Sequence, residues 1–293
     1  MKSKVVFCLF ILLSGILLFS PSAAFSKPRQ TVYFSAITLY HPIVMYQKYQ
    51  PLMNYLSNNT PYNFELKLNT DYNNIIRFLK NKEVQLALLG GITYAIAKEK
   101  IPIVPIVKPL NADGSPYYRS VIVAQSKNTT IRSIADLKDK SIAFPSKLST
   151  SGYFVPLFYL SIEAGITKDD LSSSKNFRYH DSVVWEVLRG NFDAGAVIDS
   201  VADQYIDRGL KKVWTSPPIP GLPIVVRSDE NPELVHHVKK ALLALNRKNP
   251  EHCLIMDQLD KELRYGFTSA SDKDYNIIRQ MLKVLRKKGW FQH

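Results

Sequence analysis

Hydrophobic positions along the chain follow two periods, and the two alternate. Short runs rich in β-branched and aromatic residues predict strands at 31–36, 64–68, 84–88, 103–107, 118–125, 141–144, 194–198 and 224–227. Between them, apolar stripes with the spacing of helices that bury one face occur at 75–79, 183–188 and 277–285. Strands that alternate with helices are typical of parallel α/β sheets.

Helix boundaries carry their own signals. Four glycines close predicted helices, where a left-handed residue commonly ends a helix: Gly165, Gly190, Gly209 and Gly289. Residues 133–136 and 271–274 resemble capping boxes, with Asp in place of the usual Glu, and Asn231 precedes a proline suited to a first helical turn. Pro51 interrupts an apolar stripe, so we expect a kink or a restarted helix there.

Two segments predict crossings between two parts of the molecule. Residues 111–118 and 216–223 are rich in Pro, Gly and Ser, and each leads into a strand. One αβ set lies between them, and the chain outside them can complete another. We therefore expect two α/β lobes, one inserted in the other. The first lobe comprises residues 27–118 and 222–293, and the second comprises residues 119–221.

The first 26 residues have the pattern of a secretory signal peptide. Two lysines precede a short apolar stretch, and small residues follow it. The stretch is shorter than the roughly 20 apolar residues of a membrane-spanning helix. We therefore expect an exported protein, cleaved near Ala24 or Ser26. Cys8 lies in this segment, which leaves Cys253 alone as a small buried side chain and excludes an intramolecular disulfide.

Charge narrows the choice of partner. The 293 residues include 38 Lys+Arg and 25 Asp+Glu, a formal charge of +13, which suits nucleic acid, an anionic surface or an anionic ligand. The basic residues are scattered and form no nucleic-acid-binding motif, so we expect no nucleic acid. His236, His237 and His252 lack the spacing of metal ligands, so we expect no metal.

The stretch most informative about chemistry is residues 144–152, Phe-Pro-Ser-Lys-Leu-Ser-Thr-Ser-Gly, which leaves a predicted strand and opens a helix. A helix N-terminus carries free N–H groups and partial positive charge, and therefore binds anions. Ser149, Thr150 and Ser151 add three hydroxyls, of which helix capping explains one. We interpret the stretch as an anion cradle. Neither a P-loop nor a dinucleotide motif is present, so we expect no cofactor.

His180, Asp181 and Ser182 lie where another predicted strand, 177–179, meets a helix. His180 can donate a hydrogen bond to an anion there while Asp181 or Ser182 caps the helix, although a structural histidine fits equally. Three neighbours in sequence do not make a catalytic triad, which needs partners that converge in space.

Tyrosines occupy further positions at predicted strand ends. Tyr72, Tyr94 and Tyr118 lie near the carboxyl ends of strands or in the first crossing, where α/β folds place ligands. Each of them also fits a half-buried core position.

These motifs together resemble the PhnD-like family of periplasmic solute-binding proteins, which serve ABC importers of phosphonate, phosphite and phosphate. The matching segments run in order through the chain: Asp113-Gly-Ser-Pro-Tyr-Tyr118, Ser149-Thr-Ser-Gly-Tyr-Phe-Val-Pro156, His180-Asp181, Ser216-Pro-Pro-Ile-Pro-Gly221 and Ile224-Val-Val-Arg227.

The resemblance implies a type II periplasmic binding protein: two α/β lobes, a two-strand hinge and a ligand cleft between the lobes. It implies a monomer without enzymatic activity that captures a small phosphorus oxyanion in the periplasm and delivers it to a membrane permease with its ATPase. The family's ligand contacts fall here on Tyr72, Tyr118, Ser149, Thr150, Ser151 and His180. Tyr94 and Asp181 complete the predicted site.

One departure from the family concerns specificity. Members that take aminoalkyl phosphonates hold the ammonium with acidic residues at positions that are Ser200 and Leu222 here, although Asp199 is adjacent. We therefore expect phosphite, phosphate or methylphosphonate. The alternatives are another solute (sulfonate, sulfate or an organic anion), a sensory receptor component of the same fold, and an exported phosphohydrolase, for which the chain lacks a nucleophile or metal motif.

Overall fold

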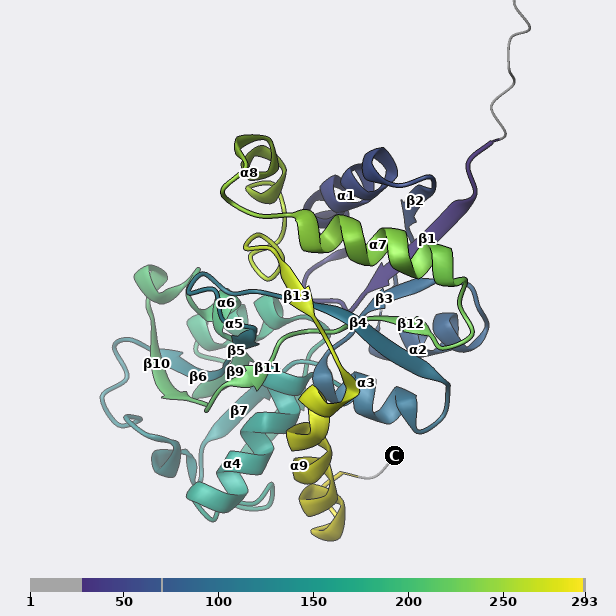
Figure 1. Cartoon of the computed structure of the whole chain (residues 1–293). Coiled ribbons are helices and arrows are strands. Elements are labelled where there is room, and N and C mark those ends of the chain that lie inside the picture. The colour runs from purple at the N-terminus through teal and green to yellow at the C-terminus, as the bar shows by residue number, and fades with distance from the viewer. Residues whose placement is uncertain (1–27, 70, 292–293) are drawn as a thin grey trace, which may run out of the picture.

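The first of two α/β lobes is built on a six-stranded sheet (Figure 1). The computed structural model describes residues 28–69 and 71–291, so the predicted signal peptide lies outside the described residues. In spatial order the strands of this sheet are β13 (Phe267–Ser269), β4 (Ile103–Pro109), β12 (Ile224–Arg227), β3 (Leu86–Leu88), β1 (Thr31–Ala36) and β2 (Asn63–Leu66). The helices of this lobe are α1 (Pro42–Asn59), α2 (Tyr72–Lys80), α3 (Gly91–Lys98), α7 (Pro232–Ala244), α8 (Pro250–Met256) and α9 (Asn276–Lys287).

The second lobe surrounds a five-stranded sheet. Its strands are, in spatial order, β10 (Leu210–Thr215), β6 (Ser120–Gln125), β9 (Ala194–Ile198), β7 (Ser141–Phe144) and β8 (Ser173–Asn176). Its helices are α4 (Val155–Glu163), α5 (His180–Leu188) and the short α6 (Asp199–Ala202). The strand predicted at 177–179 is wrong, because β8 ends at Asn176, immediately before these residues.

Two short crossing strands join the lobes. β5 (Tyr117–Tyr118) and β11 (Ile219–Pro220) form an antiparallel pair in which Ile219 lies opposite Tyr118. The pair falls within the two Pro- and Gly-rich segments that the sequence marks as crossings, and this confirms the two-lobed fold with a two-strand hinge. We keep the boundaries at 118/119 and 221/222 as proposed lobe limits.

Both sheets are mixed rather than parallel, which corrects the expectation from strand and helix alternation. β12 runs antiparallel to β3 and β4, and β13 runs antiparallel to β4. In the second sheet β6 is antiparallel to β9 and β10. The two crossings account for the directions of β6 and β12. β6 is the first strand after the crossing into the second lobe, and β12 is the first after the crossing back. Each runs antiparallel to the strands beside it.

Most local boundary signals are confirmed. The boxes at Ser133 and Ser271 each have both reciprocal hydrogen bonds, and each opens a 3₁₀ turn. Asn231 caps α7 by accepting from the Glu233 N–H. The restarted helix is wrong, because α1 runs unbroken through Pro51. Cys253 is only half buried, and its thiol donates to the Arg247 carbonyl.

The lobes are closed on one another. The Ile92 N–H of α3 donates to Thr150 Oγ1 at 3.0 Å, and the Thr93 hydroxyl donates to the Leu148 carbonyl at 2.9 Å. On the other side of the hinge, the His180 N–H donates to the Leu39 carbonyl at 3.2 Å. α9 lies against α3 and also reaches α4 (Figure 1). Residues between the lobes are therefore buried.

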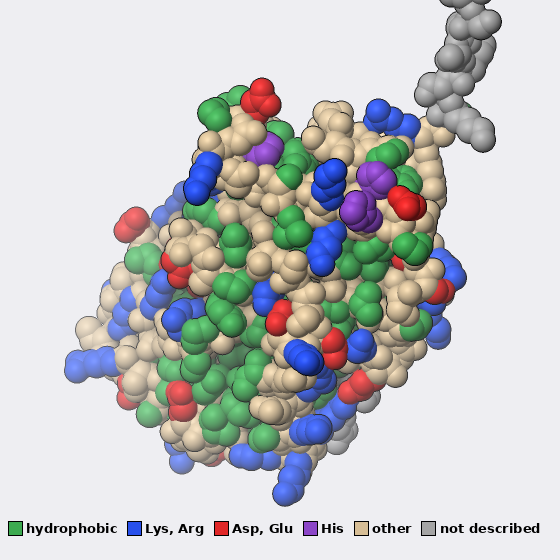
Figure 2. All heavy atoms as spheres, viewed as in Figure 1, with side chains coloured by type: hydrophobic (Ala, Val, Ile, Leu, Met, Phe, Trp, Pro, Cys, Tyr) green, Lys and Arg blue, Asp and Glu red, His purple; other side chains and the backbone are tan. Residues whose placement is uncertain are grey.

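On the face shown in Figure 2, Lys and Arg side chains are dispersed among acidic and hydrophobic ones and do not gather into one patch. Within residues 28–69 and 71–291, no helix combines the length and the apolar character that a membrane crossing requires. The same residues contain no cluster of His, Cys, Asp and Glu suited to a metal ion.

Candidate functional site

The predicted cradle forms a widened helical turn. β7 ends at Phe144, and a π-helical turn, Thr150–Phe154, leads directly into α4. The Ser149 carbonyl accepts from the N–H groups of both Tyr153 and Phe154. Turns of this kind are rare in helices and frequent at functional sites. Here the turn lies at the boundary between the lobes, where Thr150 accepts the Ile92 N–H of the first lobe.

Gly152 is required by close packing within this turn. A Cβ atom at this position would lie 2.0 Å from Cγ of Pro145 and 2.9 Å from Cε1 of His180. No side chain fits there without moving the loop or the imidazole. The glycine therefore allows the cradle and His180 to lie close together.

Ser149 and His180 form a buried hydrogen-bonded pair. The exposed fractions of their side chains are 2% and 1%, and Ser149 Oγ lies 3.0 Å from His180 Nε2. His180 Nδ1 accepts the Ile198 N–H at 3.1 Å. Since Nδ1 is an acceptor, the ring proton of the neutral imidazole is on Nε2, and Nε2–H donates to Ser149 Oγ.

Burial holds His180 in this neutral form, because it lowers the pKa of the imidazole to about 3. Ser149 Oγ also accepts the Gly152 N–H at 3.0 Å, so both acceptor positions of the hydroxyl are used. Its own proton is then free to be donated to a ligand. His180 thus orients Ser149, and both of its ring nitrogens are already bonded within the protein.

The neighbouring residues of the cradle are held in the same way. Thr150 Oγ1 accepts the Ile92 N–H from the opposite lobe, and the Ser151 carbonyl accepts the Ser120 hydroxyl at 2.6 Å. Thr150 and Ser151 are both 3% exposed. The protein therefore fixes the positions of three consecutive buried residues, each of which carries a hydroxyl.

Two buried tyrosines approach this cradle. The Tyr72 and Tyr118 hydroxyls have no hydrogen-bond partner among the described residues. Burial raises the pKa of each phenol well above its ordinary value; nearby Ser149 opposes the rise at Tyr72, and nearby Thr150 opposes it at Tyr118. These hydroxyls are close but do not have hydrogen-bonding geometry. A buried phenol without a partner is costly, so this arrangement is suited to a ligand.

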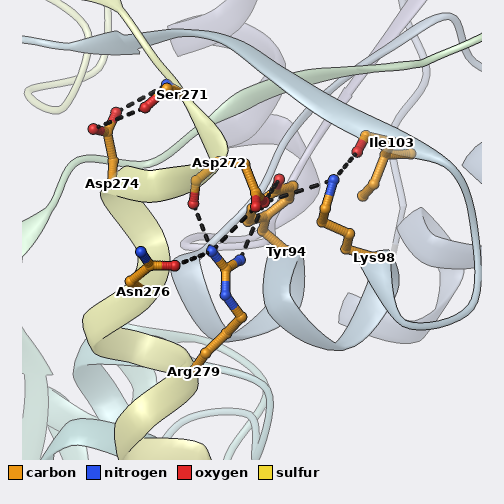
Figure 3. Close-up of polar contacts among 8 residues, drawn as sticks. All are labelled: Tyr94, Lys98, Ile103, Ser271, Asp272, Asp274, Asn276 and Arg279. Carbon is orange, nitrogen blue, oxygen red and sulfur yellow. Dashed lines mark hydrogen bonds and ion pairs between the residues drawn. The ribbon is translucent and has the colours of Figure 1, made fainter.

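Tyr94 lies in a different network. Its hydroxyl donates to Asp272, which also pairs with Arg279 at 3.1 Å and Lys98 at 3.6 Å. Figure 3 shows this group between α3 and the start of α9. The network fixes the C-terminal helix to the first lobe. Because the Tyr94 hydroxyl is used there, we leave Tyr94 out of the proposed site.

Asp181 is also separate from the hydroxyls of the cradle. Its carboxylate accepts its neighbour's N–H, that of Ser182, at 2.7 Å, and the N-cap position of α5 belongs to Tyr179. Burial is the main cause that raises the pKa of Asp181. The charge of Asp181 in turn contributes to raising the pKa of Tyr40 in the first lobe. Asp181 therefore lies near the boundary between the lobes.

Sequence reasoning missed an acidic residue, Glu262, in a cavity that shares Tyr118 with the proposed site. We call the cradle and this cavity together the chamber, and the residues that line the cavity its opposite wall. A cavity of about 190 Å³ is lined by Tyr118, Asp199, Ser200, Leu222 and Glu262, among others. Glu262 is 9% exposed and follows α8. It lies outside every motif discussed above, so no sequence pattern could identify it. Tyr118 lies between this cavity and the cradle, because both Thr150 and Glu262 influence its pKa.

Two lobes, a two-strand hinge and buried donors between them define a solute-binding protein that encloses its ligand. Residues 34–275 match the family of ABC transporter, phosphonate, periplasmic substrate-binding proteins. The chain belongs to this family. It is a substrate-binding component of a transport system, not an enzyme, and the family is periplasmic.

Several relatives cover nearly the whole chain. The chain is 27% identical to the phosphate-import protein PhnD of Mycolicibacterium smegmatis, over 87% of this chain and 86% of that protein. It is 25% identical to the probable ABC transporter phosphite binding protein PhnD1 of Prochlorococcus marinus, over 95% and 98%. The structure of PhnD1 from Prochlorococcus marinus in complex with methylphosphonate superposes with a TM-score of 0.77 at 22% identity, covering 89% of this chain and 99% of that one.

Proposed function

We propose that the protein captures a small phosphorus oxyanion, namely phosphite, phosphate or methylphosphonate, and delivers it to an ABC permease. The observation that carries this proposal is the pair of buried, unpartnered tyrosine hydroxyls beside Ser149 and Thr150. Phosphorus oxyanions present several acceptor oxygens around one centre. The convergent hydroxyl donors match that arrangement.

The anion is held by neutral donors in this proposal. Ser149 donates its hydroxyl proton because both acceptor positions of its oxygen already take up bonds from the protein. Thr150 Oγ1 accepts the Ile92 N–H, and its hydroxyl proton is likewise donated to the ligand. Tyr72 and Tyr118 donate from the other sides. The partial positive charge at the start of the helix adds to the attraction. Ser151 completes the cradle, and His180 acts through Ser149 as a positioning residue.

Capture requires the lobes to separate and close. The cradle is buried, and the hydrogen bonds of Thr150, Thr93 and His180 to the opposite lobe are among those that join the lobes. A ligand therefore reaches it only when the bonds of Thr150, Thr93 and His180 to the opposite lobe are broken. Rotation about β5 and β11 provides this motion. The closed monomer then presents both lobes together to the permease.

Calorimetric titration tests this function. The protein is unfolded and refolded to remove carried-over ligand, then titrated with phosphite, phosphate, methylphosphonate and, as matched controls, sulfate and methylsulfonate. We expect a Kd in the micromolar range or below for at least one phosphorus oxyanion. Stronger binding of sulfate, methylsulfonate or another organic anion moves the function to a different solute. Absence of measurable binding for every ligand favours a receptor role and contradicts the proposal.

A further inference from the structure

The second wall of the binding chamber has an unusual carboxyl group. Glu262 lies between α8 and β13, and its side chain lines the cavity that also contains Asp199 and Ser200. No described cation forms an ion pair with it. Lys48, whose charge lowers the pKa of Glu262, is paired with Asp260 at 2.8 Å. Glu262 is therefore a buried acid without a counter-ion.

The surroundings of Glu262 are mostly acidic or phenolic. The charges of Asp199 and Asp260 raise the pKa of Glu262, and the nearby Ser200 hydroxyl and Lys48 lower it. The titratable groups that line its cavity or interact with it electrostatically come from α1 and the residues before it, β5, α6 with its C-cap, and the segment of Glu262 itself: Tyr40, Lys48, Tyr49, Tyr117, Tyr118, Asp199, Asp203, Asp260, Lys261 and Tyr265.

Independent observations indicate that this wall meets a ligand. The Ser200 hydroxyl and the Tyr118 hydroxyl are buried without a partner among the described residues, and both residues line the same cavity as Glu262. Tyr118 is 5% exposed and also approaches Thr150 of the cradle. In the complex that the proposed function requires, the ligand's remaining substituent, here called its tail, extends past Tyr118 toward this cavity.

We propose that Glu262 is a specificity-determining residue of the chamber, protonated beside an uncharged ligand tail and ionised beside a cationic one. This inference rests on the proposed function, because it requires an oxyanion at the cradle. An ionised Glu262 repels the anion of a ligand with an uncharged tail. A cationic tail instead supplies the counter-ion that Glu262 lacks. The charge of the ligand tail thus determines whether Glu262 is protonated or ionised in the complex.

The pKa of Glu262 in the ligand-free protein allows the ligand to select either protonation state. Burial, followed by the charges of Asp199 and Asp260, raises the pKa of Glu262 to about 8. The carboxyl group is thus mostly protonated at neutral pH. An anion with an uncharged tail is bound with proton uptake above this pH, and its affinity falls as the pH rises. A ligand with an ammonium tail is bound with proton release below this pH, so its relative affinity rises with pH.

The test compares the wild-type protein with Glu262→Gln, using methylphosphonate, ethylphosphonate and 2-aminoethylphosphonate at pH 6 to 9. The ligand's own titration cancels in the ratio of the two proteins' affinities for one ligand. For methylphosphonate, we expect the affinity of wild type relative to Glu262→Gln to fall about tenfold between pH 7 and pH 9, as the protonated fraction of the carboxyl group falls. For 2-aminoethylphosphonate, the same ratio of wild-type to Glu262→Gln affinity should instead rise with pH over this range, as the ionised fraction of the carboxyl group rises.

Two control variants keep the result interpretable. Glu251→Gln removes an exposed glutamate from neighbouring α8 and should behave as the wild type. Glu262→Asp keeps the acid and should keep the pH dependence, and thermal unfolding verifies that all variants fold. A constant ratio between wild type and Glu262→Gln across the pH range overturns the role of Glu262 while the cradle stands. Absence of binding by either protein to every phosphonate overturns the proposed function as well.

Discussion

The cradle and the opposite wall are both built around a buried titratable group, and burial acts on them in opposite directions. At the cradle, burial lowers the pKa of the base His180, to about 3. At the wall, burial raises the pKa of the acid Glu262, to about 8. Both groups are therefore mostly neutral near pH 7. In the proposed complex, the cradle therefore offers neutral hydrogen-bond donors to the anion, and the protonation of Glu262 alone responds to the charge of the ligand tail.

The largest expected effect is at the cradle. Ser149→Ala combined with Thr150→Ala removes two donors to a charged ligand, each contributing about 1.5 to 3 kcal/mol. We expect the Kd for the best phosphorus oxyanion to rise at least about tenfold, measured by calorimetry. The matched control combines Thr129→Ala and Ser172→Ala, both exposed on the same lobe. Unchanged affinity in the cradle variant contradicts the cradle assignment.

Removal of single tyrosine hydroxyls separates the site from the α9 network. Tyr72→Phe deletes an unpartnered hydroxyl that we assign to the ligand, so we expect affinity to fall about tenfold with little loss of stability. Tyr94→Phe instead deletes the bond to Asp272 and should lower the free energy of unfolding by about 1 to 2 kcal/mol while affinity changes less than about twofold. Equal losses of affinity in both variants return Tyr94 to the site.

His180→Ala should weaken binding, because Ser149 loses the donor that orients it. The ratio of wild-type to variant affinity for one ligand should be flat from pH 5 to pH 8, since a pKa of about 3 keeps the imidazole neutral over this range. His236→Ala, an exposed histidine, serves as the control. A ratio that falls above pH 6 indicates an imidazolium in the complex and is incompatible with this account.

The smallest effect concerns stability without ligand. The pKa of Glu262 is higher in the folded protein, about 8 against an ordinary 4.5, so its contribution to stability is full below the ordinary value and is lost as the pH rises through 8. Glu262→Gln should therefore melt at least about 2 °C above the wild type at pH 9, with a smaller advantage at pH 6. Parallel melting curves at both pH values contradict the raised pKa.

The local geometry of the proposed cradle was predictable from sequence because it depends on neighbouring residues. Ser149, Thr150 and Ser151 are consecutive, and a strand delivers them to the start of a helix. The capping boxes and the crossing segments were predictable for the same reason, since each depends on a few neighbouring residues. The hydrogen bond between Ser149 and His180 required the fold, because it joins residues 31 positions apart.

The acid of the opposite wall was not predictable, because Glu262 enters the chamber from a segment without a motif. Asp199, Ser200 and Leu222, which the sequence analysis considered for an ammonium group, line the same cavity. Strand direction also escaped prediction: the hydrophobic pattern gives the same strand whether it runs parallel or antiparallel, and the hinge crossing determines the direction of β6 and β12.

Phosphorus NMR tests the central claim most directly, because it observes the bound atom itself. One equivalent of phosphite, phosphate or methylphosphonate is added to refolded wild-type protein and to the Ser149→Ala, Thr150→Ala variant. We predict a separate resonance of bound ligand with the wild type for at least one of the three, and its loss in the variant. Only the free resonance with all three ligands, or an unchanged bound resonance in the variant, would contradict a buried hydroxyl cradle for a phosphorus oxyanion.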